Sequence, residues 1–448
     1  MDKFDIIVIG AGPAGKNIAL ELEKSGLNIA IIEKDKVGGT CLNEGCIPAK
    51  LYLESASYVY KLKHFSNVGV QVENISFDMQ QLKTKKDELL NLLRDGASGK
   101  LEKSTVELFY GEASFIDKNS IKVGEKTLKA DKFIIASGSK HRPHPLLEVD
   151  EKQIIWSRDV FELEKLPKSI LIVGGGAIGC EFATFFNALG AEVHIAEFTP
   201  QLVPAEDSDV AKALQRELTK KGIKITLNAN VTSFTKNKSS VNITMQTKTK
   251  VEESEYELVL VSIGRAPNTD GLNLENAGIQ SDRGFITVNE KLQTSTTNIY
   301  ALGDVITTPA LAHTAYNEAS VLAKNIINNT HNKPSSIIPF VTFCQPQVAS
   351  IGKNEKTLKN EGIEYKVVKH FFKSNAKAKI KGDDSGFIKL LCEKNSGIIL
   401  GGAMIGQDTT ELIHELLVTI EKKTSVDELA QMVFAHPTLS ESIWDMVR

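Results

Sequence analysis

The chain has 448 residues, which exceeds the size of one ordinary hydrophobic core and predicts about three domains. Hydrophobic residues make up 42% of the chain and charged residues 24%, a composition that is typical of soluble globular proteins and excludes a disordered chain. The net charge of -3 is too small to favour polyanions, so neither nucleic acids nor membranes are expected as partners.

The first predicted element is a strand over residues 4–9, which ends at a glycine-rich turn and leads into a helix. The turn reads Gly10-x-Gly12-x-x-Gly15, and Glu33 ends the next apolar run 18 residues later. Such glycines let the backbone approach a pyrophosphate at the helix N-terminus, and such an acid accepts hydrogen bonds from a ribose. A glycine turn alone is often only structural, but strand, helix and acid together predict a dinucleotide site.

The apolar run at the N-terminus is also informative because it is short. It is far too short for the hydrophobic region of a signal peptide or for a membrane span. We therefore expect the protein to be cytoplasmic.

The chain has five cysteines, at positions 41, 46, 180, 344 and 392. They are too few for a disulfide scaffold, yet Cys41 and Cys46 stand five positions apart, just before a helix with Pro48 at its start. Two buried structural thiols are one interpretation, and a zinc site would need further ligands that this segment lacks. A redox-active pair fits better, because the dipole of the helix stabilises a thiolate at its N-terminus. No metal is expected.

Between residues 51 and 136 the pattern changes from helical to alternating. Leu, Tyr and Lys recur at helical spacing over residues 51–63 and 78–103, and alternating strands follow over residues 105–136. We assign these elements to the first nucleotide-binding unit.

A second strand, glycine turn and helix begin at Ser169, which indicates two nucleotide-binding units in one chain. The turn reads Gly174-x-Gly176-x-x-Gly179, and Glu197 ends the next strand, again 18 residues later. A carboxylate there repels a 2′-phosphate, and the residues after it offer no arginine to receive one. The second unit is therefore predicted to bind NAD(H) in preference to NADP(H).

The remaining elements are less regular. Alternating residues over 224–227 and 258–263 predict strands that complete the second unit. The polar segment 328–336 is typical of a loop and indicates the last domain boundary. A mixed α+β region is expected after it.

The segment Gly38-Gly-Thr-Cys-Leu-Asn-Glu-Gly-Cys-Ile-Pro-Ala-Lys50 resembles the active-site signature of the pyridine nucleotide-disulfide oxidoreductases. The resemblance spans essentially the whole chain and is strongest to the dihydrolipoamide dehydrogenases. It implies that Cys41 exchanges with the substrate disulfide and that Cys46 lies against the flavin of FAD. It also implies that Lys50 lies near flavin N5, with Glu181 as its carboxylate partner, where a cation assists hydride transfer.

Three further segments resemble the family. Residues 297–304 resemble its second FAD motif, and residues 136–138 and 263–268 resemble its crossing segments between domains. Together with the two glycine turns, they imply FAD contacts from Gly10, Gly12, Gly15, Glu33, Lys34, Gly39, Thr40, Lys50, Ser137, Gly138, Asp304, Leu311, Ala312 and His313. They imply NAD contacts from Gly174, Gly176, Ile178, Gly179, Glu197, Gly264 and Arg265.

Near the C-terminus the chain reads Ala435-His436-Pro-Thr-Leu-Ser-Glu441. Thr438 and Glu441 can form a capping box, so an ordinary helix start is one interpretation. A histidine oriented by a carboxylate can also act as a base near neutral pH, which a dithiol substrate requires. The family places this pair against the disulfide of the other subunit, so the resemblance implies a homodimer.

We therefore predict an α/β fold with two Rossmann-like units, one for FAD and one for NAD, and a C-terminal α+β dimerisation domain. The predicted segments are residues 1–147 (FAD), 148–266 (NAD), 267–334 (return to the FAD domain) and 335–448 (dimerisation). The predicted activity is oxidation of dihydrolipoyl groups through a Cys41–Cys46 disulfide and FAD, with hydride passed to NAD⁺. The predicted partner is a lipoylated carrier protein or a 2-oxo acid dehydrogenase or glycine cleavage-type complex.

Two alternatives stay open. A reductase of another disulfide, of the glutathione type, shares the two cysteines, but Glu197 argues against the NADPH-linked members. Leu439 and residues 311–313 are more similar to the lipoamide enzymes. A redox-sensing flavoprotein or scaffold is the second alternative, and it predicts the loss of a catalytic residue, whereas none is lost.

Some residues depart from the family pattern. Glu44 lies between the two cysteines, where a carboxylate raises thiol pKa values and biases the choice of substrate. Phe434 stands where many lipoamide enzymes have a histidine. Cys344 has no visible partner in the sequence and is interpreted as structural. These departures weaken any assignment of the lipoyl protein that is served.

Overall fold

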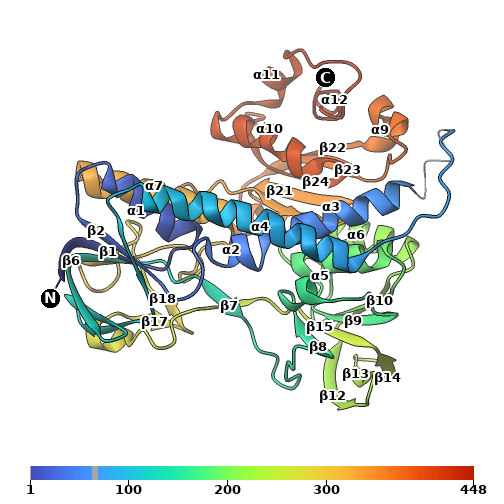
Figure 1. The fold of residues 1–448 in the computed structure, drawn as a ribbon. Coiled ribbons are helices and arrows are strands. Elements are labelled where there is room, and N and C mark those ends of the chain that lie inside the picture. Colours follow the sequence, from blue (N-terminus) through green and yellow to red (C-terminus); the bar gives the residue numbers. More distant parts are fainter. Residues whose placement is uncertain (1, 63–68) are drawn as a thin grey trace. The chain divides into compact units, whose positions relative to one another are not determined.

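The computed structural model describes residues 2–62 and 69–448, which form two compact units (Figure 1). The first unit contains the chain up to Leu51 and the segments Gln80–Arg142 and Arg265–Ser335. The second unit contains the described part of Tyr52–Met79 and the segments Pro143–Gly264 and Ser336–Arg448. The chain thus leaves the first unit and returns to it at Arg265, while the bounds of the four predicted segments stay predictions.

The first unit is built on a seven-stranded sheet with the strand order β3-β2-β1-β6-β5-β4, and β19 also pairs with β6. Its strands are β1 (Asp2–Ile9), β2 (Ile29–Glu33), β3 (Glu107–Tyr110), β4 (Ala113–Asp117), β5 (Ser120–Val123), β6 (Lys126–Ile135) and β19 (Ile299–Ala301). The pairs of β1 with β2 and β6, of β2 with β3 and of β19 with β6 are parallel, whereas β4, β5 and β6 form antiparallel hairpins. The strands predicted over residues 105–136 are confirmed.

Apolar sequence explains why the parallel strands lie in the centre of this sheet. All five residues of β2 are buried, as a strand with both faces covered requires. Helices α1 (Pro13–Glu23) and α7 (Ala312–Asn328) pack against each other and share a hydrophobic core with the sheet. Because α1 starts directly after β1, its N-terminus lies at the carboxyl end of a parallel strand, where nucleotides bind in folds of this kind.

Two long helices follow the first strands. α3 (Cys46–Leu62) and α4 (Met79–Glu102) confirm the helices predicted over residues 51–63 and 78–103, although residue 63 lies outside the described residues. α3 starts at Cys46, which places this sulfur at a helix N-terminus. The short helix α2 (Gly39–Asn43) carries Cys41.

The second unit begins its own parallel sheet with the strand order β11-β10-β9-β15-β8. These strands are β8 (Ile154–Trp156), β9 (Ser169–Val173), β10 (Glu192–Glu197), β11 (Lys224–Leu227) and β15 (Leu258–Val261). β11 and β15 confirm the two strands predicted at 224–227 and 258–263. Helix α5 (Ala177–Ala188) follows β9, helix α6 (Ser208–Lys220) follows β10, and β12 (Asn230–Lys236), β13 (Val241–Gln246) and β14 (Val251–Tyr256) form a separate antiparallel sheet.

The C-terminal part of the second unit is the predicted α+β region. Its antiparallel sheet has the order β20-β21-β24-β23-β22. The strands are β20 (Phe340–Thr342), β21 (Gln347–Gly352), β22 (Tyr365–Phe371), β23 (Phe387–Glu393) and β24 (Ile399–Gly406), and the helices are α8 (Glu355–Asn360), α9 (Ala376–Ile380), α10 (Thr409–Glu421), α11 (Val426–Ala430) and α12 (Glu441–Asp445). In the part of the chain that the structure describes, every helix is too short or too polar to cross a membrane.

Smaller elements complete the fold. The two-stranded sheets are β7 (Ser139–His141) with β16 (Arg265–Pro267), and β17 (Ser281–Asp282) with β18 (Phe285–Ile286). The first of these sheets joins the two points at which the chain leaves and re-enters the first unit. It therefore brings Ser139 and Arg265 together, although 126 positions separate them.

Candidate active site

The two predicted redox cysteines lie together in the first unit. Both are thiols in the structure, Cys46 is exposed and Cys41 is half-buried. The pKa of the Cys41 thiol is raised far above its ordinary value, first by its hydrogen bond to Cys46 and then by burial, while the Lys50 ammonium opposes the shift. The Cys41 thiol therefore stays protonated and hydrogen-bonded beside Cys46, which lies at the start of α3.

A hydrogen-bonded chain leads from the cysteine loop to Asp304. The Arg265 guanidinium donates to Thr40 Oγ1 at 3.4 Å and, through Nε, to Ser139 Oγ at 2.6 Å. Ser139 Oγ donates in turn to Asp304 Oδ2 at 2.6 Å. The pKa of Arg265 is lowered by burial, against the opposing charges of Asp304, Glu44 and Cys46. Glu44 and Cys46 therefore lie within electrostatic reach of a buried cation.

These hydrogen bonds bear on the prediction that Arg265 contacts NAD. The hydrogen bonds of its guanidinium go to Thr40 and Ser139, both in the first unit, where FAD is predicted. The NAD contact stays a prediction, and the geometry favours a role of Arg265 beside the cysteine loop.

The first turn requires glycines because other segments of the backbone approach it closely. A Cβ on Gly10 (φ +104°) would lie 2.4 Å from the carbonyl oxygen of Ala136, and one on Gly15 would lie 1.8 Å from that of Gly10. A Cβ on Gly39 would lie 2.8 Å from Gly12 Cα. The turn after β1 and the loop before Cys41 therefore touch through their backbones, beside the N-terminus of α1.

The second glycine turn has the same design in the second unit. A Cβ on Gly174 (φ +109°) would lie 2.5 Å from the carbonyl oxygen of Ser262, and one on Gly179 would lie 1.9 Å from that of Gly174. Gly176 caps α5 and leaves open space beside it. The two fingerprints thus fold into equivalent turns.

The acids that end β2 and β10 are also held alike. Glu33 accepts hydrogen bonds from Ala11 N at 2.8 Å and Asp35 N at 2.9 Å. Glu197 accepts from Gly175 N at 2.5 Å and Thr199 N at 2.6 Å, and it is only 6% exposed. Each oxygen keeps a lone pair for a ribose hydroxyl, whereas a phosphate would be repelled.

The predicted partners of the cysteines are distributed over both units. Lys50 lies on α3 in the first unit, and Glu181 lies on α5 in the second, where it accepts a hydrogen bond from Phe343 N at 2.9 Å. Their pairing therefore stays a prediction.

His436 and Glu441 form the predicted pair. His436 Nδ1 lies 2.8 Å from Glu441 Oε1, and the imidazole is 74% exposed. The other carboxylate oxygen accepts from Thr438 N at 2.8 Å, and Glu441 N donates back to Thr438 Oγ1 at 3.3 Å. The hydrogen bond from Thr438 N, and then His436, hold the pKa of Glu441 below its ordinary value. The helix-capping and the base-orienting interpretations are thus compatible.

Comparisons with known proteins agree with this arrangement. Residues 4–319 match the family described as Pyridine nucleotide-disulphide oxidoreductase, and residues 338–447 match the dimerisation domain of that family. The chain belongs to the pyridine nucleotide-disulfide oxidoreductases.

Individual relatives extend over the whole chain. The mitochondrial dihydrolipoyl dehydrogenase of Pisum sativum is 35% identical over 452 residues, which cover 99% of this chain and 90% of the relative. The structure of LpdA from Mycobacterium tuberculosis has a TM-score of 0.91 at 26% identity and covers 100% of this chain and 99% of its own. The HOCl-induced flavoprotein disulfide reductase RclA from Escherichia coli has a TM-score of 0.89 at 26% identity and covers 99% of each chain.

Family membership confirms the predicted fold class and the predicted cofactors. Pyridine nucleotide-disulfide oxidoreductases use FAD and NAD, and this chain is an oxidoreductase of the disulfide reductase type. The residues present fit FAD. Among the residues that the structure describes, the buried oxygens without a hydrogen-bond partner include Asn43 Oδ1, Ser137 Oγ and Thr314 Oγ1 in the first unit, and Gln407 Oε1 and Ser442 Oγ in the second. Those of the first unit fit a bound polar ligand.

Three residues of this region were missed in the sequence. Ser139 links Arg265 to Asp304, and the buried Glu318 of α7 accepts from Gly303 N at 2.7 Å, which shapes the turn before Asp304. Tyr316, also on α7, lies near the cysteines. Burial, and then the charges of both cysteines, raise the pKa of its hydroxyl. No local pattern marks these side chains, since each acts on a segment far away in the sequence.

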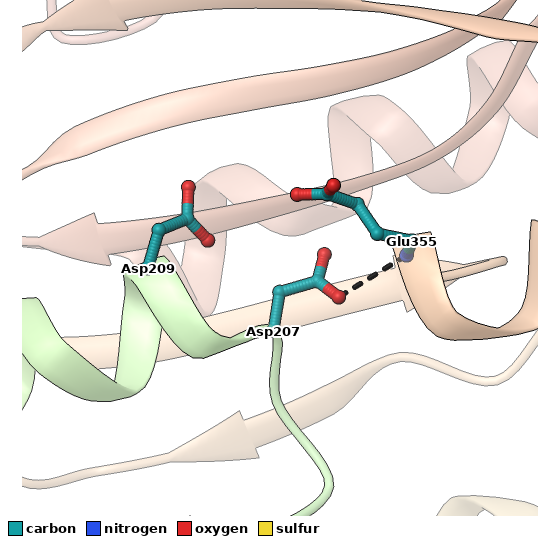
Figure 2. A group of neighbouring side chains, drawn as sticks. All are labelled: Asp207, Asp209 and Glu355. Carbon is teal, nitrogen blue, oxygen red and sulfur yellow. Dashed lines mark hydrogen bonds between the residues drawn. The ribbon is translucent and has the colours of Figure 1, made fainter. Parts of the chain in front are cut away.

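A second group of charged side chains lies outside the predicted site. Asp207, Asp209 and Glu355 point toward one another from α6 and α8 (Figure 2). Just before them, Glu206 accepts a hydrogen bond from Ser350 Oγ at 2.9 Å. Burial and the neighbouring Asp207 raise the pKa of Glu206 to about 7, against the opposing effects of Ser350 and Lys389. This carboxyl is therefore protonated in the folded protein at pH values where it is ionised after unfolding.

We expect Glu206→Gln to stabilise the protein at alkaline pH only. Between pH 4.5, the ordinary pKa of a glutamate, and about pH 7, the folded state holds a proton on Glu206 that the unfolded state lacks. The stability that Glu206 contributes therefore falls as pH rises and is lost above pH 7. The glutamine cannot ionise, so its advantage over the wild type should grow by on the order of 2 kcal/mol between about pH 5 and about pH 8. Thermal unfolding of the holoenzyme at both pH values measures this difference.

Glu252→Gln is the matched control. Glu252 has its pKa lowered to about 2 by hydrogen bonds from Lys224 and Lys250, so it is ionised in both states across this pH range. Its effect on stability should not change with pH there. An equally constant effect for Glu206→Gln would contradict the prediction.

Proposed function

We propose that the protein is a dihydrolipoamide dehydrogenase, which oxidises a dihydrolipoyl group and reduces NAD⁺. The observation that carries the choice of NAD⁺ is the carboxylate of Glu197, buried at the end of β10 and fixed by two backbone N–H groups. The sulfur chemistry rests on the hydrogen-bonded thiols of Cys41 and Cys46. The 35% identity to the pea dihydrolipoyl dehydrogenase supports the substrate.

In the proposed reaction, Cys41 and Cys46 start as a disulfide. His436 takes the proton from one thiol of the dihydrolipoyl group, and the resulting thiolate attacks Cys41 Sγ, which forms a mixed disulfide and releases Cys46 as a thiolate. The second substrate sulfur then closes the lipoyl ring, and its proton passes to Cys41 as that sulfur leaves. The substrate loses two electrons and two protons, and the cysteine pair holds both electrons.

FAD, when bound, accepts this electron pair and delivers it as hydride to NAD⁺. We propose that FAD is bound by Gly10, Gly12, Gly15, Glu33, Lys34, Gly39, Thr40, Lys50, Ser137, Gly138, Asp304, Leu311, Ala312 and His313. NAD is proposed to be bound by Gly174, Gly176, Ile178, Gly179, Glu197, Gly264 and Arg265. Lys50 and Glu181 are proposed as a pair that stabilises charge beside the flavin.

The active form is proposed to be a homodimer in the cytoplasm, in which His436 of one copy serves the disulfide of the other. The match to a dimerisation domain supports the dimer. The exposure of His436 at 74% and of Val433 at 97% is consistent with a surface that a second copy covers. The lipoyl group is proposed to come from a separate carrier protein or a 2-oxo acid dehydrogenase or glycine cleavage-type complex.

A second candidate is a reductase that acts on another disulfide. Glu44 favours it, because this carboxylate lies between the two cysteines and within electrostatic reach of Arg265. The likeness to RclA also supports it, since that protein is described as a flavoprotein disulfide reductase.

Steady-state kinetics of the holoenzyme separate the two candidates. We expect rapid NAD⁺ reduction with dihydrolipoamide and little NADPH or NADH oxidation with glutathione disulfide. A clear preference for either reductase reaction would replace the lipoamide assignment by the second candidate.

A further inference from the structure

The loop 198–207, which connects β10 to α6, contacts the second glycine turn. Val203 N donates to the carbonyl oxygen of Gly175 at 2.8 Å, and a Cβ on Gly175 would lie 2.5 Å from Leu202 Cδ2. At its start, Thr199 N donates to Glu197 Oε1 at 2.6 Å. The loop therefore helps to hold the carboxylate and the turn that the NAD site needs.

The backbone of this loop is strained at Val203. This residue has a φ of 40°, although it is β-branched and only 5% exposed. β-Branched residues rarely adopt the left-handed conformation, and they keep it only where the surrounding structure enforces it. The loop therefore needs a firm attachment on both sides of Val203.

On the C-terminal side of Val203, Lys389 of β23 provides this attachment. Its Nζ lies 2.8 Å from Asp207 Oδ2, 2.7 Å from Asp209 Oδ1 and 2.9 Å from Glu355 Oε1, and its side chain is 0% exposed. Asp207 also accepts from Glu355 N at 3.1 Å (Figure 2). Lys369 donates to Asp209 Oδ2 at 2.6 Å. The end of the loop and the start of α6 are thus bound to the C-terminal sheet.

The charges of this cluster explain why the attachment is strong. The three carboxylates could together hold a metal ion, but the ammonium of Lys389 already lies between them. A buried ammonium is stable only when several acceptors compensate for lost water, and its removal would leave the carboxylates facing one another. The arrangement is therefore an internal ion cluster around one lysine.

We propose that Lys389 is a positioning residue for the nicotinamide dinucleotide. By binding residues 207–209 to the C-terminal sheet, it holds the strained loop against Gly175 and thereby keeps Glu197 in place for the ribose. The inference rests on the proposed function only in assigning the nucleotide to the second glycine turn. It implies that nucleotide affinity depends on a residue of the C-terminal domain that touches neither cofactor nor thiol substrate.

The test is Lys389→Met in the FAD-loaded protein. We expect the Kd for NADH and the KM for NAD⁺ to rise about tenfold, a change of the size that coupled networks produce. The reduction of the enzyme by dihydrolipoamide in the absence of nucleotide should stay within about twofold of the wild type, as should kcat at saturating NAD⁺. Lys394→Met removes an exposed lysine just after β23 that pairs with Glu364, and it should change none of these values.

Asp209→Asn provides a second variant in case Lys389→Met does not fold. It leaves the ammonium with two carboxylates and removes the partner of Lys369, so we expect about threefold weaker NADH binding. Combined with Lys389→Met it should recover part of the lost affinity, since one unpaired carboxylate is gone.

Two outcomes would overturn the inference. One is unchanged NADH affinity in a folded Lys389→Met or Asp209→Asn protein, and the other is a parallel loss of nucleotide binding and of thiol reduction. If the wild type binds NADH but does not oxidise dihydrolipoamide, only the proposed substrate is contradicted. The comparison of NADH affinity between the wild type and the variants would still support or overturn the role of Lys389.

Discussion

Cys46→Ser is expected to abolish turnover and the long-wavelength absorbance that arises when a thiolate contacts an oxidised flavin. The variant cannot form the disulfide that accepts electrons from the substrate, so dihydrolipoamide-dependent NAD⁺ reduction should fall by at least about a thousandfold. The absorbance should vanish because Cys46, at the N-terminus of α3, is the sulfur proposed to lie against the flavin. Absorbance spectra after two-electron reduction, together with steady-state rates, measure both effects.

Cys41→Ser separates the roles of the two sulfurs. It should lose turnover equally, but it should retain the absorbance band, because the Cys46 thiolate remains. Cys392→Ser, a change at a buried thiol of the C-terminal sheet, should affect neither property. Persistence of the band in Cys46→Ser would show that Cys46 does not face the flavin.

His436→Gln is expected to reduce turnover with dihydrolipoamide by roughly a hundredfold to a thousandfold at neutral pH, the usual contribution of a general base. Its Nδ1 is 2.8 Å from Glu441 Oε1, so the carboxylate orients the ring. The activity of the variant should rise with pH up to the range where the substrate thiols ionise unaided. Reduction of the flavin by NADH should not change, since no thiol takes part in that step.

Glu441→Gln and His414→Gln complete this test. Glu441→Gln keeps the shape of the pair but removes its charge, so we expect a smaller loss of about tenfold. His414 is an exposed histidine on α10 whose Nδ1 lies 3.1 Å from the Glu411 carbonyl oxygen, and its replacement should have no effect. Equal rates for His436→Gln and the wild type at neutral pH would remove His436 from the mechanism.

Several charged side chains lie around the cysteine pair. Arg265 is buried near Cys46, and Glu44 and Asp304 lie within its electrostatic reach. The guanidinium favours a thiolate, whereas the Glu44 carboxylate opposes it.

Features that depend on neighbouring residues were predicted well from the sequence. The glycine turns are examples, because a side chain on Gly10 or Gly15 would collide with backbone only a few ångströms away. The strands over residues 105–136 and the helix over 78–103 were also predicted, since hydrophobic periodicity depends on near neighbours. The five-residue spacing of the cysteines was informative for the same reason: a short loop before a helix is enough to bring the two sulfurs together.

Interactions between distant segments could not be predicted. No pattern in the sequence connects Arg265 with Ser139, or Lys389 with Asp209 at a separation of 180 positions. The strained φ of Val203 is equally invisible, because valine is an ordinary residue in any loop until the backbone around it is known.

The sequence by itself thus determined the two glycine turns, the acids that follow them and the neighbouring cysteine pair, since each is a local arrangement imposed by backbone geometry and spacing. Only the tertiary structure decided which buried charges compensate one another, such as Lys389 with its three carboxylates and Arg265 with the cysteine loop. The physical reason is that a buried charge is stable only beside partners of opposite sign, and folding, not sequence proximity, brings those partners together.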